Sequence, residues 1–284
     1  MAEYFVRPDF AGDESALLRD PGQLLAWARD VAASAQPADV YRNKEGRKTL
    51  RFRRDGRSYF LKLHSGIGWG EVFKNLLQAR LPVLGAVNEY RAVLALQQLG
   101  VDTLSVAAFA SRGFNPATVE SLIVTDDLAQ TVSLEDYCAD WAASPPPFAV
   151  RLKILRKVAD SARRMHVAGI NHRDFYICLF HLDEASLAEP QPRCHLIDLH
   201  RAQMRRRTPR RWQVKDLAGL YFSAMDCGLR RRDLLRFMRH YSDGGLRTAL
   251  GRDRFLWQSV ARRADSLYRR VHGRTPPAPG GAAP

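Results

Sequence analysis

The chain changes character near Leu128, and this change limits the folds available to it more than any other feature. Residues 39–128 hold short runs rich in β-branched and aromatic residues, which predict strands, with one amphipathic helix among them. Asp55-Gly56 joins two of these runs and is a dipeptide typical of a tight β-hairpin. After Leu128 amphipathic helical segments predominate. We therefore expect an α+β, bilobal fold, with a small β-rich N-lobe and a larger helical C-lobe on either side of a cleft.

The two ends of the chain differ from these lobes. A short helix is expected near the N-terminus, where Asp20 and Pro21 form a helix start signal. The stretch "GRTPPAPGGAAP" at the other end is of low complexity and predicts a disordered tail. The expected order is an N-terminal extension, the N-lobe, the C-lobe and the tail, at residues 1–38, 39–128, 129–272 and 273–284.

The sequence favours a cytoplasmic protein. Its apolar runs fall short of the ~20 residues that a membrane-spanning helix needs. The first residues, "MAEYFVRPDFAGDESA", are mixed and partly acidic, which is not the pattern of a secretory signal.

The formal net charge of +14 indicates an anionic partner, such as a nucleic acid, an anionic membrane surface or an acidic protein. Much of the charge lies in "RAQMRRRTPRR", where we expect an anion-binding surface; a row of solvated arginines is the alternative. The sequence shows neither an RNA-binding fingerprint nor a helix-turn-helix spacing, so no nucleic-acid partner is expected. The candidate anion-binding residues are Arg205, Arg206, Arg207, Arg210 and Arg211.

Lys62 and Glu89 are candidates for a functional ion pair. Strand alternation in "SYFLKLH" places Lys62 on the same face as Phe60 and His64, and a lysine inside an apolar strand is costly unless a carboxylate or phosphate meets it. Glu89 lies on the apolar face of the following helix. Such a pair positions the phosphates of a nucleotide. An edge-strand lysine that reaches water and a glutamate at a helix boundary are the alternatives.

The tripeptide His172-Arg173-Asp174 lies between a long amphipathic helix, which ends at Gly169, and an apolar strand. In this place the tripeptide is typical of a catalytic loop that transfers phosphate. Asp174 would accept the proton of the attacking hydroxyl and orient that hydroxyl. A helix-to-strand turn with a capping aspartate is the alternative.

Two further aspartates are candidate site residues. Asp198 closes the apolar strand in "CHLIDLHRA", where a magnesium ion would offset the cost of a buried carboxylate; an ion pair with an arginine is the alternative. Asp216 begins a strongly apolar helix. We expect it to support the catalytic loop by hydrogen bonds to the loop backbone, and a simple helix N-terminal charge is the alternative.

Lys62, Glu89, the tripeptide at 172–174 and Asp198, in this order, resemble the protein-kinase-like fold. The stretches "GIGWGEVFKNLL", "GINHRDFYIC", "LIDLHRAQ" and "PRRWQVKDLAGLYFSAMDCGLRRRD" are similar to those of the bacterial lipopolysaccharide core heptose kinases that phosphorylate the first heptose. The similarity extends over residues 40–272. It implies ATP and Mg²⁺ as co-substrates and a heptose hydroxyl, O-4, as the acceptor.

The resemblance also implies a role for each matching residue. Gly46 is the only glycine in "NKEGRKT", where the phosphate-covering loop is expected, although a kinase normally carries several glycines there. The implied catalytic residues are Asp174, His172 and Arg173, the nucleotide-binding residues are Lys62, Glu89 and Gly46, and the magnesium ligand is Asp198.

Leu179 departs from the family pattern, because kinases in general carry Asn and the heptose kinases usually carry His at this position. His181 points to the same face of the strand two residues later and is expected to substitute as a metal ligand. The alternative is that the second metal ligand is missing.

The implied partners fit the charge. The acceptor is a lipid A–core lipopolysaccharide at the cytoplasmic face of the inner membrane, where the protein is expected to be peripheral. Trp69 and Phe73 are candidates for a membrane contact or for holding a lipid chain, and an ordinary packing insert is the alternative. The resemblance also implies acyl carrier protein, an acidic partner. Two other functions stay open: a catalytically weak or inactive binding protein on a kinase fold, and a kinase for the keto-sugar Kdo.

Overall fold

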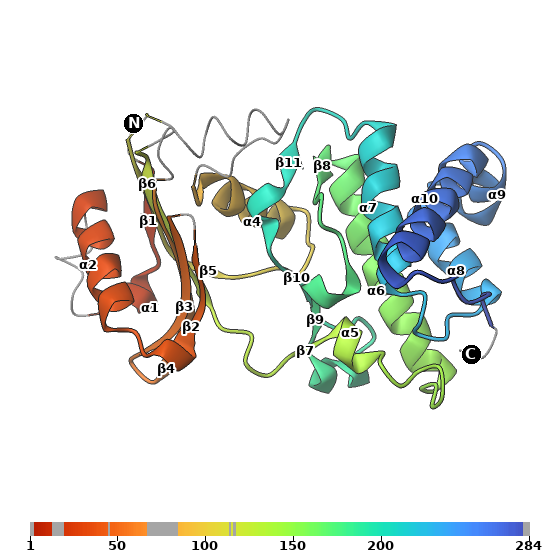
Figure 1. Ribbon diagram of the computed structural model, residues 1–284, viewed down its shortest axis with the longest axis horizontal. Coiled ribbons are helices and arrows are strands. Elements are labelled where there is room, and N and C mark those ends of the chain that lie inside the picture. Colours follow the sequence, from red (N-terminus) through yellow and green to blue (C-terminus); the bar gives the residue numbers. More distant parts are fainter. Residues whose placement is uncertain are drawn as a thin grey trace. The chain divides into compact units, whose positions relative to one another are not determined.

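The computed structural model describes residues 3–12, 20–44, 46–66, 85–113, 115 and 118–280. They form two compact units: Met1–Leu94 with Leu104–Ala129, and Ala95–Thr103 with Gln130–Pro284. The first unit is built on a β-sheet and the second mainly on helices (Figure 1). The expected α+β class, with strands first and helices after them, is confirmed.

The first unit contains a six-stranded antiparallel sheet in the order β1-β5-β6-β4-β3-β2. The hairpin between β3 and β4 turns at Asp55 and Gly56, whose φ angles of 50° and 74° are those of the turn that this dipeptide favours. The predicted hairpin is therefore confirmed. The strands are β1 (Glu3–Val6), β2 (Val40–Lys44), β3 (Arg47–Arg54), β4 (Arg57–Ser65), β5 (Val106–Arg112) and β6 (Glu120–Asp126).

Helix α2 (Pro21–Ser34) covers one face of this sheet. Its N-terminus is the predicted one, because the Asp20 carboxylate accepts hydrogen bonds from two backbone amides of the first turn. Leu24 and Leu25 are buried in one core with Leu50 and Leu61 of the sheet. The shorter elements of this unit are α1 (Pro8–Ala11) and η2 (Pro37–Asp39), and α4 (Val87–Gln98) begins in it.

Two elements within the first 38 residues pack on this sheet. Strand β1 pairs with β5, so that Glu3 lies opposite Ser111 and Val6 opposite Ala108. The apolar face of α2 is buried against the same sheet. An amphipathic helix gains stability by burying its apolar stripe, and here the sheet provides the apolar surface.

The second unit consists of helices with two small sheets, in the orders β10-β9-β7 and β11-β8. Helix α6 packs against α8, and α7 packs against α10 (Figure 1). None of the described helices is both long and apolar enough to cross a lipid bilayer. The helices are α5 (Leu134–Tyr137), α6 (Phe148–Val167), α7 (Arg210–Ser223), α8 (Arg231–Tyr241), α9 (Gly245–Leu250) and α10 (Arg254–His272). The strands are β7 (Val132–Ser133), β8 (Ile170–Asn171), β9 (Phe180–Leu182), β10 (Cys194–Leu196) and β11 (Gln203–Met204), and the 3₁₀ turns are η3 (Ile177–Leu179), η4 (Glu184–Ala188) and η5 (Leu199–Arg201).

Hydrogen bonds place two segments of this unit that lie far apart in the chain. Residues 95–103 belong to it, and the Thr103 hydroxyl donates a 2.6 Å hydrogen bond to the Leu196 carbonyl at the end of β10. At the other end, part of the predicted disordered tail has a defined position. The amide of Gly280 donates a hydrogen bond to the carbonyl of Leu229, and residues 281–284 lie outside the described part of the chain.

Candidate active site

Lys62 and Glu89 form the predicted ion pair within the first unit. Lys62 lies on β4 and its ammonium is 2.5 Å from the Oε1 atom of Glu89, on the first turn of α4. Glu89 is fully buried, and its Oε2 atom has no hydrogen-bond partner among the described residues. Thr49 lies opposite Lys62 on β3, and its buried hydroxyl is likewise without a described partner. Buried polar atoms of this kind are usually satisfied by a water, an ion or a ligand.

Gly46 lies in the turn between β2 and β3. Its φ of 66° is in the left-handed region that favours glycine, and its carbonyl accepts a 2.8 Å hydrogen bond from the amide of Ser65 at the end of β4. The hairpin expected to cover the phosphates therefore carries its glycine at a turn that requires one.

The predicted catalytic loop begins at Gly169, just after the end of helix α6. Gly169 has a φ of 84°, and a Cβ atom on it would lie 1.8 Å from the carbonyl oxygen of Arg205, so only glycine fits. The carboxylate of Asp216, on α7, accepts hydrogen bonds from the amides of His172 and Arg173 at 2.6 and 2.9 Å. This is the contact predicted from the sequence. Asp216 is fully buried and thus fixes the loop from inside the protein.

The loop is also tied to the segment that carries Asp198. The Nε2 atom of His172 lies 2.9 Å from the carbonyl oxygen of Ile197, which allows a hydrogen bond. Only three described residues other than glycine have a positive φ: Asp55 in the hairpin, Arg173 and Asp198. Arg173 and Asp198 directly follow the two residues, His172 and Ile197, that this hydrogen bond joins. Backbone strain of this kind is concentrated at functional sites.

Asp174 is contacted by a residue that the sequence did not single out. The Nη1 atom of Arg201 lies 2.9 Å from both carboxylate oxygens of Asp174. Asp174 keeps about a quarter of its side-chain surface exposed, which leaves room for a second group at the carboxylate. Arg201 follows Asp198 by three residues, and the intervening 3₁₀ turn η5 brings its side chain back to the loop.

Asp198 fits a magnesium site. Its carboxylate is 33% exposed and lies 2.7 Å from the Nδ1 atom of His200. The described residues include no group of three or more His, Cys, Asp or Glu side chains that could hold a metal ion. A magnesium ion at Asp198 would therefore take most of its ligands from water and phosphate oxygens, which is its usual mode with enzymes that bind nucleotides.

His181 lies on β9 opposite His195, which precedes Asp198 by three residues in the chain. Its Nδ1 atom is 3.2 Å from the Thr131 hydroxyl, and burial lowers the pKa of His181. The role of His181 as a metal ligand stays a prediction, and the contacts of its side chain in the structure are with other groups.

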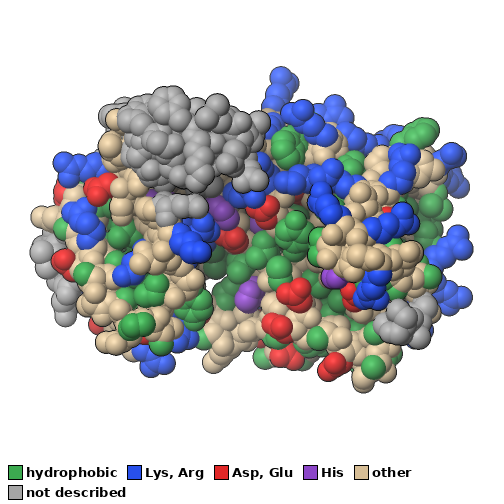
Figure 2. All heavy atoms as spheres, viewed as in Figure 1, with side chains coloured by type: hydrophobic (Ala, Val, Ile, Leu, Met, Phe, Trp, Pro, Cys, Tyr) green, Lys and Arg blue, Asp and Glu red, His purple; other side chains and the backbone are tan. Residues whose placement is uncertain are grey.

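The predicted anion-binding arginines divide into two groups. Arg205 donates 2.6 Å hydrogen bonds to the side-chain carbonyls of Asn171 and Gln203, and Arg210 lies 3.6 Å from Asp253. The other three, Arg206, Arg207 and Arg211, are exposed. Figure 2 shows basic side chains gathered over the edge of the second unit where β11 and α7 lie. The predicted membrane contacts, Trp69 and Phe73, lie outside the described residues.

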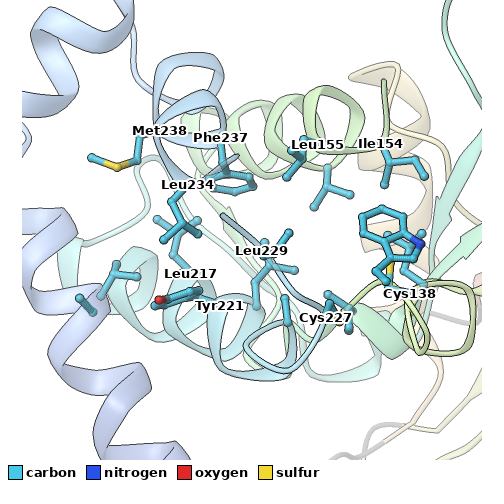
Figure 3. Close-up of a pocket in the computed structure, with 18 of the residues that line it drawn as sticks. Cys138, Ile154, Leu155, Leu217, Tyr221, Cys227, Leu229, Leu234, Phe237 and Met238 are labelled. Atoms are coloured by element: carbon cyan, nitrogen blue, oxygen red, sulfur yellow. The ribbon is translucent and has the colours of Figure 1, made fainter. Parts of the chain in front are cut away.

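The second unit also contains a partly open apolar cavity of about 170 Å³, which the sequence did not predict. It lies among α6, α7, α8 and α10, and the residues that line it include Leu155, Tyr221, Leu234, Phe237 and Met238 (Figure 3). The two buried cysteines at its border, Cys138 and Cys227, come from segments far apart in the sequence. A cavity with an apolar lining suits an apolar ligand.

The chain is similar to proteins of one family throughout most of its length. The model of the lipopolysaccharide kinase (Kdo/WaaP) family matches residues 31–241. A curated relative from Pseudomonas aeruginosa, named lipopolysaccharide core heptose(I) kinase WaaP, is 48% identical over 258 residues, which cover 89% of this chain and 96% of that protein. A relative of the same name from Escherichia coli K12 is 46% identical, with 89% and 97% covered.

A solved structure, described as WaaP in complex with acyl carrier protein, has a TM-score of 0.76 and 40% sequence identity. The match covers 94% of this chain and 99% of that chain. The family match, the identity to the curated relatives and the shared fold lead to one conclusion: the chain belongs to the lipopolysaccharide kinase (Kdo/WaaP) family.

Proposed function

We propose that the protein transfers the γ-phosphate of ATP to a heptose hydroxyl of the lipopolysaccharide core, namely O-4 of the first heptose. The names of the curated relatives, at 46–48% identity over 89% of the chain, support the substrate. The observation that carries the chemistry is the position of Asp174 on a loop fixed by Asp216 and by the His172–Ile197 contact. A buried support of this kind holds a general base in one orientation.

Each residue has a defined task in this proposal. Asp174 accepts a hydrogen bond from the acceptor hydroxyl and takes its proton as the hydroxyl oxygen attacks phosphorus. Lys62, held by Glu89, binds the phosphates of ATP, and Asp198 is the ligand of Mg²⁺. A magnesium ion held by Asp198 would supply positive charge to offset the negative charge of the phosphate. Arg201 orients the Asp174 carboxylate through its contact with both oxygens.

Asp174→Asn tests the assignment, because the substitution keeps the size of the side chain and removes the base. Transfer of phosphate to dephosphorylated core should fall by about 10²–10⁴-fold. Asp243→Asn is the matched control, since Asp243 is 82% exposed. Mass spectrometry of the core oligosaccharide gives the site of phosphorylation. Full activity of the Asp174 variant would exclude this residue as the base, and phosphate on Kdo in place of heptose would favour the Kdo kinase alternative.

Leu179 supports a second candidate, a kinase-fold protein with weak or no catalysis. Its side chain offers no metal ligand, and its carbonyl accepts a hydrogen bond from the amide of Ile197, next to Asp198. Thermal-shift titration with ATP, with and without Mg²⁺, separates the two candidates. An active kinase should be stabilised by ATP and Mg²⁺ together, and Leu179→Asn should lower the Mg²⁺ concentration needed for half-maximal rate. An inactive protein would show neither effect.

We further propose that acyl carrier protein is a partner and that its acyl chain occupies the apolar cavity. The solved relative in complex with acyl carrier protein and the net charge of +14 support the partner. The cavity offers the acyl chain an apolar environment. Val158→Trp would fill the cavity from α6. The substitution should weaken co-elution with acylated carrier protein and leave binding of the unacylated form unchanged. If wild type and Val158→Trp bind the acylated and unacylated forms equally well, the cavity does not hold the acyl chain.

The acceptor in this proposal is membrane-embedded, so we place the protein at the cytoplasmic face of the inner membrane as a peripheral protein. The basic side chains over β11 and α7 support this location, because they attract anionic lipid headgroups. Flotation with anionic vesicles tests it, and equal flotation with neutral vesicles would remove the electrostatic explanation.

A further inference from the structure

Four cations surround one aromatic ring at the start of helix α7. The charged groups of Arg173, Arg211 and Lys215 each lie 5.5 Å from the centre of the Trp212 ring, and that of Arg205 lies 5.7 Å from it. A single cation over a tryptophan is a common stabilising contact. Four like charges around one ring also repel one another, so the ring alone does not account for the cluster.

The cluster is short of negative charge. Within the part of the chain that the structure describes, Arg173, Arg211 and Lys215 form no ion pair. Arg205 is bound only to neutral side-chain carbonyls. Lys215 and Arg173 are half-buried, and burial, together with neighbouring arginines, lowers the pKa of both groups.

The nearby carboxylates are already engaged. Asp216 accepts the two loop amides, and Asp174 is bound by Arg201. The charges of Arg201 and Asp174 act on both Arg173 and Lys215, which places the cluster beside the catalytic loop. The indole N–H of Trp212 is also buried and has no hydrogen-bond partner among the described residues. Positive charge and an unsatisfied donor thus occur together next to the proposed base.

We propose that Arg173, Arg211, Lys215 and Trp212 form a binding site for an acidic group, a carboxylate or phosphate, on the acceptor saccharide. This inference rests on the proposed function and specifies the acceptor further. The site binds the acidic group close to the hydroxyl that Asp174 activates, because Arg173 directly precedes Asp174 in the chain. Arginine and lysine donate charge-assisted hydrogen bonds to such groups, and a fixed anion on one sugar orients the neighbouring sugar for attack.

The proposal predicts a selective loss of acceptor binding. Lys215→Gln and Arg211→Gln should each raise KM for the acceptor by about 10- to 100-fold, the range for a lost charge-assisted hydrogen bond, with KM for ATP unchanged. Arg239→Gln is the matched control, because it removes the same charge from an exposed position on α8. Equal KM values for the control and the two cluster variants would overturn the proposal.

Two modified acceptors identify the acidic group: core in which the Kdo carboxylate is reduced to an alcohol, and core that lacks the lipid A phosphates. The difference in acceptor KM between wild type and Lys215→Gln should disappear with the acceptor that lacks the recognised group. If the difference in KM persists with both modified acceptors, recognition of an acidic group is refuted. Calorimetric titration of the acceptors into Asp174→Asn, with and without Lys215→Gln, measures the same effect on binding without phosphate transfer. If the wild type does not phosphorylate heptose, the proposed function is refuted, and the titration still shows whether the cluster binds an acidic group.

Discussion

Removal of the Asp216 carboxylate should detach the catalytic loop from helix α7. The two loop amides that it binds, those of His172 and Arg173, lie at 2.6 and 2.9 Å, and Asp216 itself is fully buried. In Asp216→Ala both amides lose their acceptor, and a buried donor without a partner costs about 1–3 kcal/mol. The expected loss is therefore about 2–6 kcal/mol, a large share of the stability of a typical domain.

Two measurements test this magnitude. Urea unfolding gives the change in free energy, and hydrogen exchange followed by mass spectrometry reports the protection of residues 172 and 173 directly. Protection there should fall to the level of an open loop, and phosphate transfer should be lost with it. Asp216→Asn is a milder variant for the case in which the alanine variant does not fold, since its amide oxygen retains one acceptor.

Asp243→Ala is the control, because Asp243 is 82% exposed and such surface changes usually alter stability by less than about 0.5 kcal/mol. The reasoning is refuted if Asp216→Ala matches this control in stability and leaves exchange at residues 172 and 173 unchanged.

Three further predictions concern other parts of the protein. Lys62→Met should destabilise the protein by about 3–5 kcal/mol, because the buried Glu89 carboxylate loses its cation. The double variant Lys62→Met, Glu89→Leu should be more stable in urea unfolding than Lys62→Met alone, but it should remain inactive. Gly169→Ala should cost more than Gly273→Ala in the same assay: both glycines have positive φ, but only at Gly169 does an added Cβ meet a backbone oxygen, at 1.8 Å. Burial lowers the pKa of His181, so the unfolded chain takes up its proton first and stability falls as pH drops below about 6.5. His181→Gln should therefore show a smaller loss of unfolding free energy between about pH 7.5 and about pH 5, and an unchanged loss would contradict the sign.

Features set by local sequence could be predicted. The Asp55-Gly56 hairpin follows from the turn that this dipeptide favours, and the helix start at Asp20 follows from its capping side chain. Lys62 could be assigned to one face of its strand because side chains alternate along a strand. In each case the signal lies within a few residues.

Features set by contacts between distant segments could not. The pairing of β1 with β5 joins residues about a hundred positions apart, and nothing in the first strand specifies that partner. The same is true of the Arg201 contact with Asp174, which depends on how η5 turns after Asp198. For His181, alternation along one strand gives the face of the side chain but not the register with the neighbouring strand, which places it opposite His195.

Support for the catalytic loop reaches beyond Asp216 itself. His166, near the end of α6, lies with its Nε2 atom 3.4 Å from the Asp216 carboxylate and its Nδ1 atom 2.8 Å from the hydroxyl of Tyr241, on α8. All three side chains are buried, so three helices meet at the group that binds the loop amides. A buried polar network of this kind is stable only when its members are satisfied together. A substitution at His166 or Tyr241, neither of which is placed in the phosphate-transfer step, should consequently reduce activity through the position of Asp174, and it should do so together with a loss of stability.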